Sequence, residues 1–217
     1  MGCGEATTLV NVLKHLKGRR KDAYGFDISW SRIHYGNSYI NENKMDNINL
    51  FIGDLFKIPL PNNSIDIVYT SHSLEPNGGK EKEALKELFR VTNKYLILLE
   101  PGYEFGNEEI KNRMNSHGYV KNLCSISKEL GFNVIENRLF ELCANELNPT
   151  QIIVIEKQDK VGSIEVQFNC PITKTILEKE EDCYFTSKGL LAYPIIKGIP
   201  CLLAQNAIVA THLKDFK

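Results

Sequence analysis

Short apolar segments alternate with amphipathic helical segments over the first 157 residues of this 217-residue chain. Residues 95–99 are continuously apolar, as in a strand that is buried on both faces. Residues 80–92 instead place their apolar side chains at helical spacing. Strands that alternate with helices favour a mostly parallel sheet with helices on both faces. The sequence therefore predicts an α/β fold with a doubly wound, mostly parallel sheet.

The segments of this pattern can be assigned by period and by capping residues. Helices are expected at residues 5–17, at 30–43 behind a Ser29 cap, at 80–92 and, in one or two pieces around Gly118, at 106–130. Strands are expected at 23–28, 47–53, 64–71 and 95–99, with an antiparallel edge pair at 132–140 and 151–157. Residues 158–163 read as a linker. Two domains follow, a larger one at 1–158 and a small β-rich module at 164–217.

A glycine turn, Gly2-Cys3-Gly4-Glu5, directly precedes the first expected helix. Glycine lets a ligand approach the backbone, and helix N-terminal amides favour anionic or polar ligand atoms. Two glycines also fit an ordinary turn. Asp27 and Asp54 end the next two strands, and Ser71-His72 ends the strand after them. Because ligands bind beyond the carboxyl ends of parallel strands, these features predict one site at one edge of the sheet.

Composition limits the partners and the compartment. The chain has 26 basic and 27 acidic residues and a net charge of −1, which argues against a non-specific grip on nucleic acid. A basic cluster at 17–21 reads as a solvated turn. No window is apolar and long enough to cross a bilayer, and no secretory signal precedes the glycine turn. Scattered cysteines indicate reduced thiols in a cytoplasm: Cys3, Cys124, Cys143, Cys170, Cys183 and Cys201.

The order of these motifs resembles the class I S-adenosylmethionine-dependent methyltransferases, close to the branch called type 11. The matching residues are Gly2-Cys3-Gly4-Glu5, Asp27, Gly53-Asp54-Leu55, residues 64–68 running to Ser71-His72, and residues 86–92 followed by 95–101. The resemblance covers residues 2–100 well and 101–157 loosely. It implies a Rossmann-like methyltransferase fold and S-adenosylmethionine as the cofactor.

The resemblance also implies which residues hold that cofactor. The glycine turn would pass the methionine part, with Glu5 near its ammonium group. Asp27 would accept hydrogen bonds from both ribose hydroxyls, with Ile28 beside it, because a carboxylate offers two oxygens. Asp54 and the backbone of Leu55 would meet the adenine. The residues alone leave an alternative open, in which Asp27 and Asp54 are plain helix caps.

The implied reaction is methyl transfer to an oxygen, nitrogen or carbon, in which orientation of the reactants carries much of the rate. Ser71 and His72 would flank the sulfonium and the acceptor. A base is needed only if the acceptor must lose a proton, and His72 is then the first candidate and His117 the second. His72 also fits a structural wall, Glu75 fits either acceptor binding or a loop cap, and Asp66 is expected to be structural.

The chain departs from the family at its start. The family has a complete apolar strand before the glycine turn, whereas Met1 directly precedes Gly2 here. That strand would be central in the sheet, and its loss would leave buried backbone groups unpaired at about 1–3 kcal/mol each. We expect a truncated form of a longer protein, a start codon placed late, or another segment that fills the gap.

The tail resembles the small zinc-ribbon-like activator subunits of tRNA and protein methyltransferases. The matching residues are Cys170-Pro171, Cys183 and residues 193–200. Thr173 and Thr186 stand where metal-binding members carry the second cysteine of each pair. Two thiolates do not complete a tetrahedral zinc site, so no structural zinc is expected. The module would pack as a lid, a homodimer surface or an acceptor-side wall.

A small-molecule acceptor, a sugar or another metabolite, fits the near-neutral charge. Two alternatives stay open: a methyltransferase that acts on tRNA or a translation factor, and a degenerate, non-catalytic binding protein. A nicotinamide dehydrogenase also uses a glycine turn and an acidic residue after the second strand. It requires a third glycine in G-x-G-x-x-G, and Thr7 occupies that position here.

Overall fold

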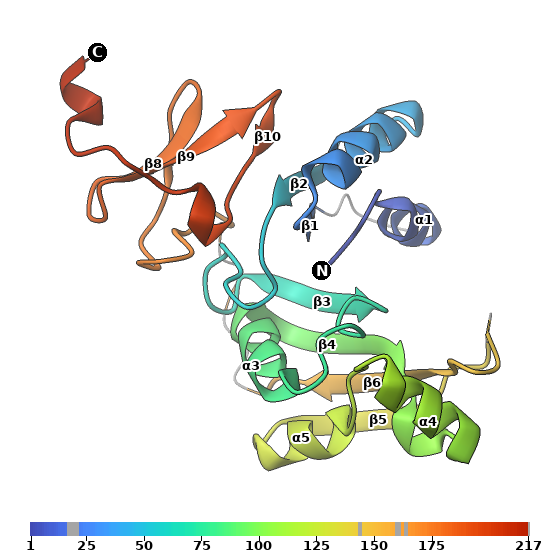
Figure 1. The fold of residues 1–217 in the computed structure, drawn as a ribbon. Helices are drawn as coiled ribbons and strands as arrows, with labels where there is room; N and C mark the ends of the chain where they lie inside the picture. The colour runs from blue at the N-terminus through green and yellow to red at the C-terminus, as the bar shows by residue number, and fades with distance from the viewer. Residues whose placement is uncertain (17–21, 143–144, 159–161, 163–164, 217) are drawn as a thin grey trace. The chain divides into compact units, whose positions relative to one another are not determined.

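The computed structural model divides the chain into two compact units (Figure 1). Unit 1 consists of Met1 and residues Asn62–Val166, and unit 2 consists of Gly2–Pro61 and Gln167–Lys217. The basic cluster expected at 17–21 and most of the expected linker at 158–163 lie outside the residues that the structure describes. Those described residues are 1–16, 22–142, 145–158, 162 and 165–216.

Unit 1 is built on a four-stranded sheet with the order β3-β4-β6-β5. Its strands are β3 (Ile65–Ser71), β4 (Thr92–Pro101), β6 (Thr150–Glu156) and β5 (Asn133–Leu139). β3 and β4 are parallel, and β6 runs antiparallel to both β4 and β5. The antiparallel pair predicted near one edge is therefore confirmed. Leu96 and Leu98 of β4 are fully buried, whereas Tyr95, Ile97 and Leu99 on the other face are half-buried, so the expected burial on both faces is complete on one face only.

Three α-helices accompany this sheet: α3 (Glu81–Val91), α4 (Glu108–Ser116) and α5 (Leu123–Glu129). α3 packs on β3 and β4, α5 packs on β5, and the two helices contact each other, so they cover the same face. The apolar stripe of α3 explains this position, since Leu85, Leu88 and Val91 are fully buried. No helix of the described residues has the length and hydropathy of a membrane span.

The first part of unit 2 is a parallel pair of strands, β1 (Ala23–Asp27) and β2 (Ile48–Ile52), with helices α1 (Thr7–His15) and α2 (Trp30–Glu42). The Ser29 hydroxyl caps α2 by accepting the backbone N–H of Arg32 at 3.4 Å, as predicted. Gly36 lies where α2 meets the glycine turn. A Cβ at Gly36 would stand 3.3 Å from the Glu5 carbonyl carbon, so a larger residue would push the turn away.

The tail contributes an antiparallel sheet to unit 2. It comprises β7 (Glu178–Lys179), β8 (Cys183–Thr186), β9 (Leu191–Ile196), β10 (Ile199–Pro200) and β11 (Ile208–Val209). A bridge between Ile52 and Cys201 joins it to the end of β2, and the Leu202 amide donates to the Ile52 carbonyl at 2.9 Å. The β-rich tail is thus confirmed, and its contacts tie it to residues 2–61. The domain boundary expected at 158–164 stays a prediction.

The mixed α/β architecture is confirmed, and the expected parallel pairing of strands is seen among the described residues as one pair in each unit. Only β1–β2 and β3–β4 are parallel pairs, and every other pairing between these strands is antiparallel. No described strand pairs with both β1 and β3, so the two parallel pairs belong to separate sheets.

Candidate functional site

The glycine turn of unit 2 adopts a left-handed backbone. φ is 62° at Gly2 and 53° at Gly4, and Ala6 just before α1 has a φ of 58°. The Cys3 amide donates to the Phe26 carbonyl at 2.8 Å, which ties the turn to β1. Because L side chains are strained at positive φ, glycine suits both positions. The conformation of this turn therefore favours glycine at both Gly2 and Gly4.

The Asp27 carboxylate lies at the end of β1 and holds this turn. Its Oδ2 accepts the Gly4 amide at 3.1 Å, and its Oδ1 accepts the Ser29 amide at 3.0 Å. Since α2 is capped by Ser29, the helix-cap alternative for Asp27 is wrong. Each carboxylate oxygen can accept two hydrogen bonds, so each keeps capacity for one more donor.

Asp54 follows at the same edge of the β1–β2 pair. Asp27 is in register with Ile52, and the Gly53 amide donates to the Asp27 carbonyl at 3.1 Å. Asp54 Oδ1 accepts the Phe56 amide at 2.9 Å within a turn, and no helix begins there. The helix-cap alternative is therefore wrong for Asp54 as well, and the two acidic residues end neighbouring strands.

The predicted cofactor and catalytic residues fall into both units. Gly2, Cys3, Gly4, Glu5, Asp27, Ile28, Asp54 and Leu55 belong to unit 2, whereas Ser71 and His72 belong to unit 1. Glu5 and Ile28 are exposed, Leu55 is half-buried, and Ser71 is the last residue of β3.

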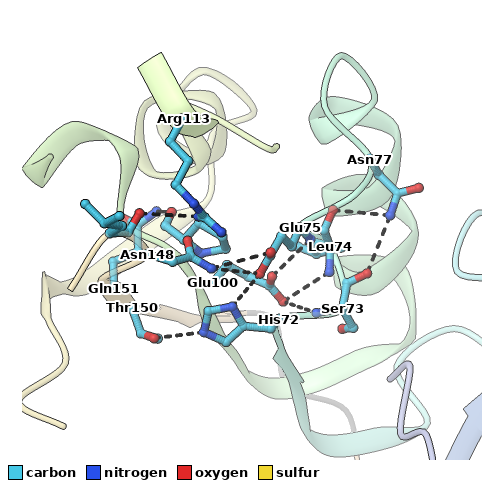
Figure 2. A network of polar contacts seen from close by, with 12 residues as sticks. His72, Ser73, Leu74, Glu75, Asn77, Glu100, Arg113, Asn148, Thr150 and Gln151 are labelled. Carbon is cyan, nitrogen blue, oxygen red and sulfur yellow. Dashed lines mark hydrogen bonds and ion pairs between the residues drawn. The ribbon is translucent and has the colours of Figure 1, made fainter. Parts of the chain in front are cut away.

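His72 is the centre of a polar cluster in unit 1 (Figure 2). Its Nδ1 lies 2.5 Å from Glu75 Oε2, and its Nε2 lies 2.8 Å from Thr150 Oγ1. An ionised carboxylate only accepts, so Nδ1 donates to Glu75 and Nε2 accepts the Thr150 hydroxyl proton when the ring is neutral. This assignment leaves the lone pair of His72 on the nitrogen that faces Thr150.

Glu75 is ionised in this cluster. Partial burial by itself raises the pKa of the Glu75 carboxyl, but hydrogen bonds from His72, Tyr119 and Asn148 outweigh that effect and hold the pKa below its usual value. Asn148 Nδ2 lies 3.4 Å from both carboxylate oxygens. The cluster thus joins residues near the ends of β3 and β6: Glu75 contacts His72 and Asn148, and His72 contacts Thr150.

Glu100 holds the backbone of this cluster through hydrogen bonds to its amides. It is fully buried in β4, and its carboxylate accepts the amides of Ser73, Leu74 and Glu75, each at 3.2 Å. Burial raises the pKa of Glu100 to about 7, although the amides of Leu74 and Ser73 act in the opposite direction. Glu100 directly follows the strand expected at 95–99, and the sequence predicted no role for it. An acidic residue that closes a continuous apolar run was the signal that could have found it.

Two other candidates have local roles. His117 Nδ1 lies 2.8 Å from the Arg113 carbonyl at the end of α4, which is a helix-end contact. Asp66 accepts hydrogen bonds from Asn93 and Lys94, each at 2.8 Å, in keeping with the expected structural role. The sequence left two roles open for Glu75, acceptor binding and a loop cap. The structure places Glu75 beside His72.

The cysteine and threonine pattern of the tail forms a chain of hydrogen bonds. Cys170 Sγ accepts the Thr173 amide at 3.3 Å and lies 3.2 Å from the Tyr193 hydroxyl. The Thr175 hydroxyl lies 2.7 Å from that of Thr173 and 2.6 Å from that of Thr186. In the described part of the chain, no group of three or more His, Cys, Asp or Glu residues could hold a metal ion. The absence of structural zinc stays a prediction.

Comparison with known proteins identifies the N-terminal region. Residues 1–94 match the family model of a methyltransferase domain. Over 89 residues, or 41% of this chain, the sequence is 30% identical to demethylmenaquinone methyltransferase from Geobacillus sp. (strain WCH70). The chain spans 37% of the length of that relative. The family match ends before the tail, so the expected zinc-ribbon likeness has no support from it.

Solved structures show the same fold. A SAM-dependent methyltransferase from Aquifex aeolicus aligns with a TM-score of 0.55 and 19% identity, over 71% of this chain and 78% of that chain. Magnesium protoporphyrin IX methyltransferase from Synechocystis PCC 6803 aligns with a TM-score of 0.57 and 15% identity, over 72% of each chain. The dehydrogenase alternative finds no support in these matches. The N-terminal region of this chain thus matches a methyltransferase domain in sequence, and the fold is one that S-adenosylmethionine-dependent methyltransferases share.

Proposed function

We propose that this chain transfers a methyl group from S-adenosylmethionine to a small-molecule acceptor. The observation that carries the proposal is the Asp27 carboxylate, which accepts the Gly4 and Ser29 amides at the rim of the glycine turn. The relatives named above support a small acceptor, since they are named for demethylmenaquinone and magnesium protoporphyrin IX. The net charge of −1 fits that class better than nucleic acid.

The donor set of unit 2 fits the cofactor. Asp27 keeps one acceptor position on each oxygen, which matches the two hydroxyls of a ribose. Asp54 would accept the adenine amino group, with the backbone of Leu55 beside it. Gly2 to Glu5 would pass the methionine part, where a turn without side chains at 2 and 4 allows close approach. When bound, the cofactor supplies an electrophilic methyl group on a sulfonium.

His72 would act as the base for an acceptor that loses a proton. Glu75 holds Nδ1–H, so Nε2 carries the lone pair, and the hydroxyl of an acceptor would take the place of the Thr150 hydroxyl as its donor. Ser73 Oγ and Asn148 Oδ1 are buried and lack a hydrogen-bond partner among the described residues. Because unpaired buried polar atoms cost free energy, these two atoms favour a methyl acceptor that carries polar groups. Ser71, beside His72, would flank the reacting groups.

Calorimetry with the full chain tests the cofactor step. We expect saturable binding of S-adenosylmethionine and weaker binding by Asp27→Asn, while the matched surface change Asp66→Asn leaves the affinity unaltered. A folded chain that binds neither S-adenosylmethionine nor S-adenosylhomocysteine would overturn the enzymatic proposal in favour of a non-catalytic binding protein.

The acceptor class is tested separately. Production of S-adenosylhomocysteine would be followed with panels of small phenols, alcohols and sugars, and with tRNA. Turnover with a small molecule that falls on His72→Ala supports the proposal. Turnover with tRNA alone would instead support the nucleic-acid alternative.

The tail offers a homodimer surface. Several of its apolar side chains are exposed, among them Ile172, Ile176, Ile208 and Val209. We propose that these exposed apolar side chains contribute to a contact between two copies of the chain. Light scattering on the purified chain should show a dimer that Val209→Glu dissociates, and a monomer at every concentration would refute it. The described cysteines are all free thiols, which suits the cytoplasmic location that we also propose.

A further inference from the structure

Arg113 is a half-buried cation of unit 1 that lies beside the polar cluster of Figure 2. It projects from α4, and its Nη1 donates to the Leu147 carbonyl at 3.4 Å. Its guanidinium carbon lies 5.7 Å from the centre of the Tyr119 ring. Figure 2 shows the side chain reaching from α4 toward Asn148, which contacts Glu75. A carbonyl and an aromatic face therefore hold the guanidinium next to the candidate catalytic residues.

The loop that carries Tyr119 is fixed to the loop that carries Glu75. The Val120 amide donates to the Glu75 carbonyl at 3.0 Å, and the Gly78 amide donates to the Gly118 carbonyl at the same distance. Gly78 permits this close approach, since an added Cβ there would lie 2.4 Å from the Gly118 carbonyl oxygen. Because two backbone hydrogen bonds join the loops, the aromatic ring that the guanidinium contacts keeps its place beside Glu75.

No carboxylate of the described residues forms an ion pair with Arg113. Glu109 precedes it by four residues on α4, which is the spacing of a helical ion pair, but the guanidinium is directed to a backbone carbonyl instead. The Glu75 carboxylate is already engaged by His72 and Asn148. A guanidinium carries five N–H donors, so most of its donors and its whole charge stay available to a ligand.

The charges near Arg113 in the chain limit the size of the anion that it can bind. Glu104 precedes α4, Glu108 and Glu109 lie in the first turn of α4, and all three are exposed. These carboxylates repel a polyanion such as nucleic acid, which needs an extended basic surface. One carboxylate or phosphate group instead matches the planar fork of a single arginine, which can donate two parallel hydrogen bonds to it.

We propose that Arg113 binds an acidic group of the methyl acceptor, so that the acceptor is a small molecule with a carboxylate or a phosphate. The inference rests on the proposed function, in which His72 removes a proton from the acceptor. The group that loses this proton would face His72 Nε2, while two N–H groups of Arg113 would donate to the acidic group. Arg113 belongs to unit 1, whereas the residues proposed for the nucleoside, Asp27 and Asp54, belong to unit 2.

Calorimetry on the full chain, with and without S-adenosylhomocysteine, tests this site. The probes are 4-hydroxybenzoate and phenyl phosphate, and 4-hydroxybenzamide is the neutral counterpart. We expect saturable one-to-one binding of at least one acid, and binding of the amide that is weaker by about tenfold or more. Arg113→Gln should weaken binding of the acid by about 10- to 100-fold, since a charge-assisted hydrogen bond is lost. Arg113→Lys keeps the charge without the fork, so its loss should be smaller.

Lys111→Gln is the matched control, because it removes one positive charge from the same helix. Residues two apart on a helix do not face each other, and the Lys111 ammonium lies 5.9 Å from the centre of a different ring, that of Tyr103. The affinity for the acid should therefore stay unaltered in Lys111→Gln.

Four results would overturn the inference: binding of neither acid, equal binding of the acid and the amide, equal losses in Arg113→Gln and Lys111→Gln, and displacement of the acid by a short RNA oligomer. The last result would indicate a nucleic-acid phosphate at this place. Methyl transfer to neutral acceptors alone would also overturn the inference while the proposed function stands. Conversely, binding of an acid through Arg113 in a chain that binds no S-adenosylmethionine would support the anion site and overturn the methyl transfer.

Discussion

The Asp27 carboxylate accepts the backbone N–H of Gly4 over a distance of 3.1 Å, although 23 residues separate them. This bond joins a turn that needs positive φ to the end of a strand that is fixed by its neighbour β2. The carboxylate therefore positions the glycine turn before any ligand arrives, and its remaining acceptor capacity points to a hydroxyl-bearing ligand.

Asp27→Asn should weaken binding of S-adenosylmethionine by about 10- to 100-fold, the effect of losing a hydrogen bond to a charged group. The amide nitrogen of asparagine would also face an N–H donor of either Gly4 or Ser29, so the turn should loosen. Calorimetry measures the affinity, and Asp66→Asn is the control. An unchanged affinity would remove Asp27 from the site.

Gly4→Ala should weaken cofactor binding through the backbone and not through a clash. The nearest heavy atom to an added Cβ is Arg32 Nη1 at 3.5 Å, but φ at Gly4 is 53°, which costs an L residue about 1–2 kcal/mol. Gly79→Ala is the matched control, because φ there is 87° and nothing lies within 4 Å of its Cβ. Both variants should lose similar stability in urea unfolding, and only Gly4→Ala should lose affinity.

Glu100 should make the protein less stable as the pH rises. Burial raises its folded-state pKa to about 7 from an ordinary value of 4.5, so the folded state binds the proton more tightly than the unfolded state. The stability that this proton contributes is full below about pH 4.5 and is lost as the pH rises through about 7. Urea unfolding at about pH 5 and about pH 8 should show this loss, on the order of 2–3 kcal/mol.

Glu100→Gln should abolish this part of the pH dependence, because glutamine does not titrate. Glu104→Gln, an exposed change four residues along, is the control. If the wild type and Glu100→Gln lose the same stability over this pH interval, the buried carboxyl is ionised throughout.

His72→Ala should raise the pKa of the Glu75 carboxyl towards its ordinary value, since His72 donates one of the hydrogen bonds that lower it. A depressed pKa means that Glu75 contributes stability above about pH 4.5, which is lost as the pH falls through its folded-state pKa. Carbon NMR of the glutamate side chains at varied pH measures this directly. The control is His212→Ala, which removes an exposed ion pair with Asp215 and should leave the pKa of Glu75 unchanged.

Thr186→Val should destabilise unit 2 by about 0.5–1.5 kcal/mol, because it removes one of the two hydrogen bonds of the Thr175 hydroxyl and leaves the bond to Thr173. Thr186 is 1% exposed, so valine fits its buried position without exposing apolar surface. Thr211→Val, at an exposed position, should stay within about 0.5 kcal/mol of the wild type. Chemical denaturation separates the two, and equal effects would show that the hydroxyl chain contributes little.

Local patterns predicted most of the elements, because they depend on nearby residues. The Ser29 cap, the apolar stripe of α3 and the apolar run of β4 each carry their own signal over a few positions. The strand ends at Asp27 and Asp54 followed from the same reasoning. These parts of the candidate site could therefore be located from sequence, although their ligands stay proposals.

Pairings between distant segments could not be predicted in the same way. Nothing local marks Thr150 as the partner of His72, 78 residues away, or Glu100 as the acceptor of the amides at 73–75. The bridge from Ile52 to Cys201 likewise depends on tertiary packing. The order of the strands could not be predicted for the same reason, since it is decided by which edges meet and not by the strands themselves.

The bridge between Ile52 and Cys201 also bears on how the protein forms during translation. Residues 62–166 are contiguous and can fold as soon as the ribosome has released them, because domains generally fold as units and in order of synthesis. Residues 2–61 must wait for the last fifty or so residues before their own sheet gains its tail contacts. A nascent chain that has released residues 62–166 from the ribosome, but not yet the tail, should thus hold a folded middle and an immature start, so the half with the glycine turn matures last.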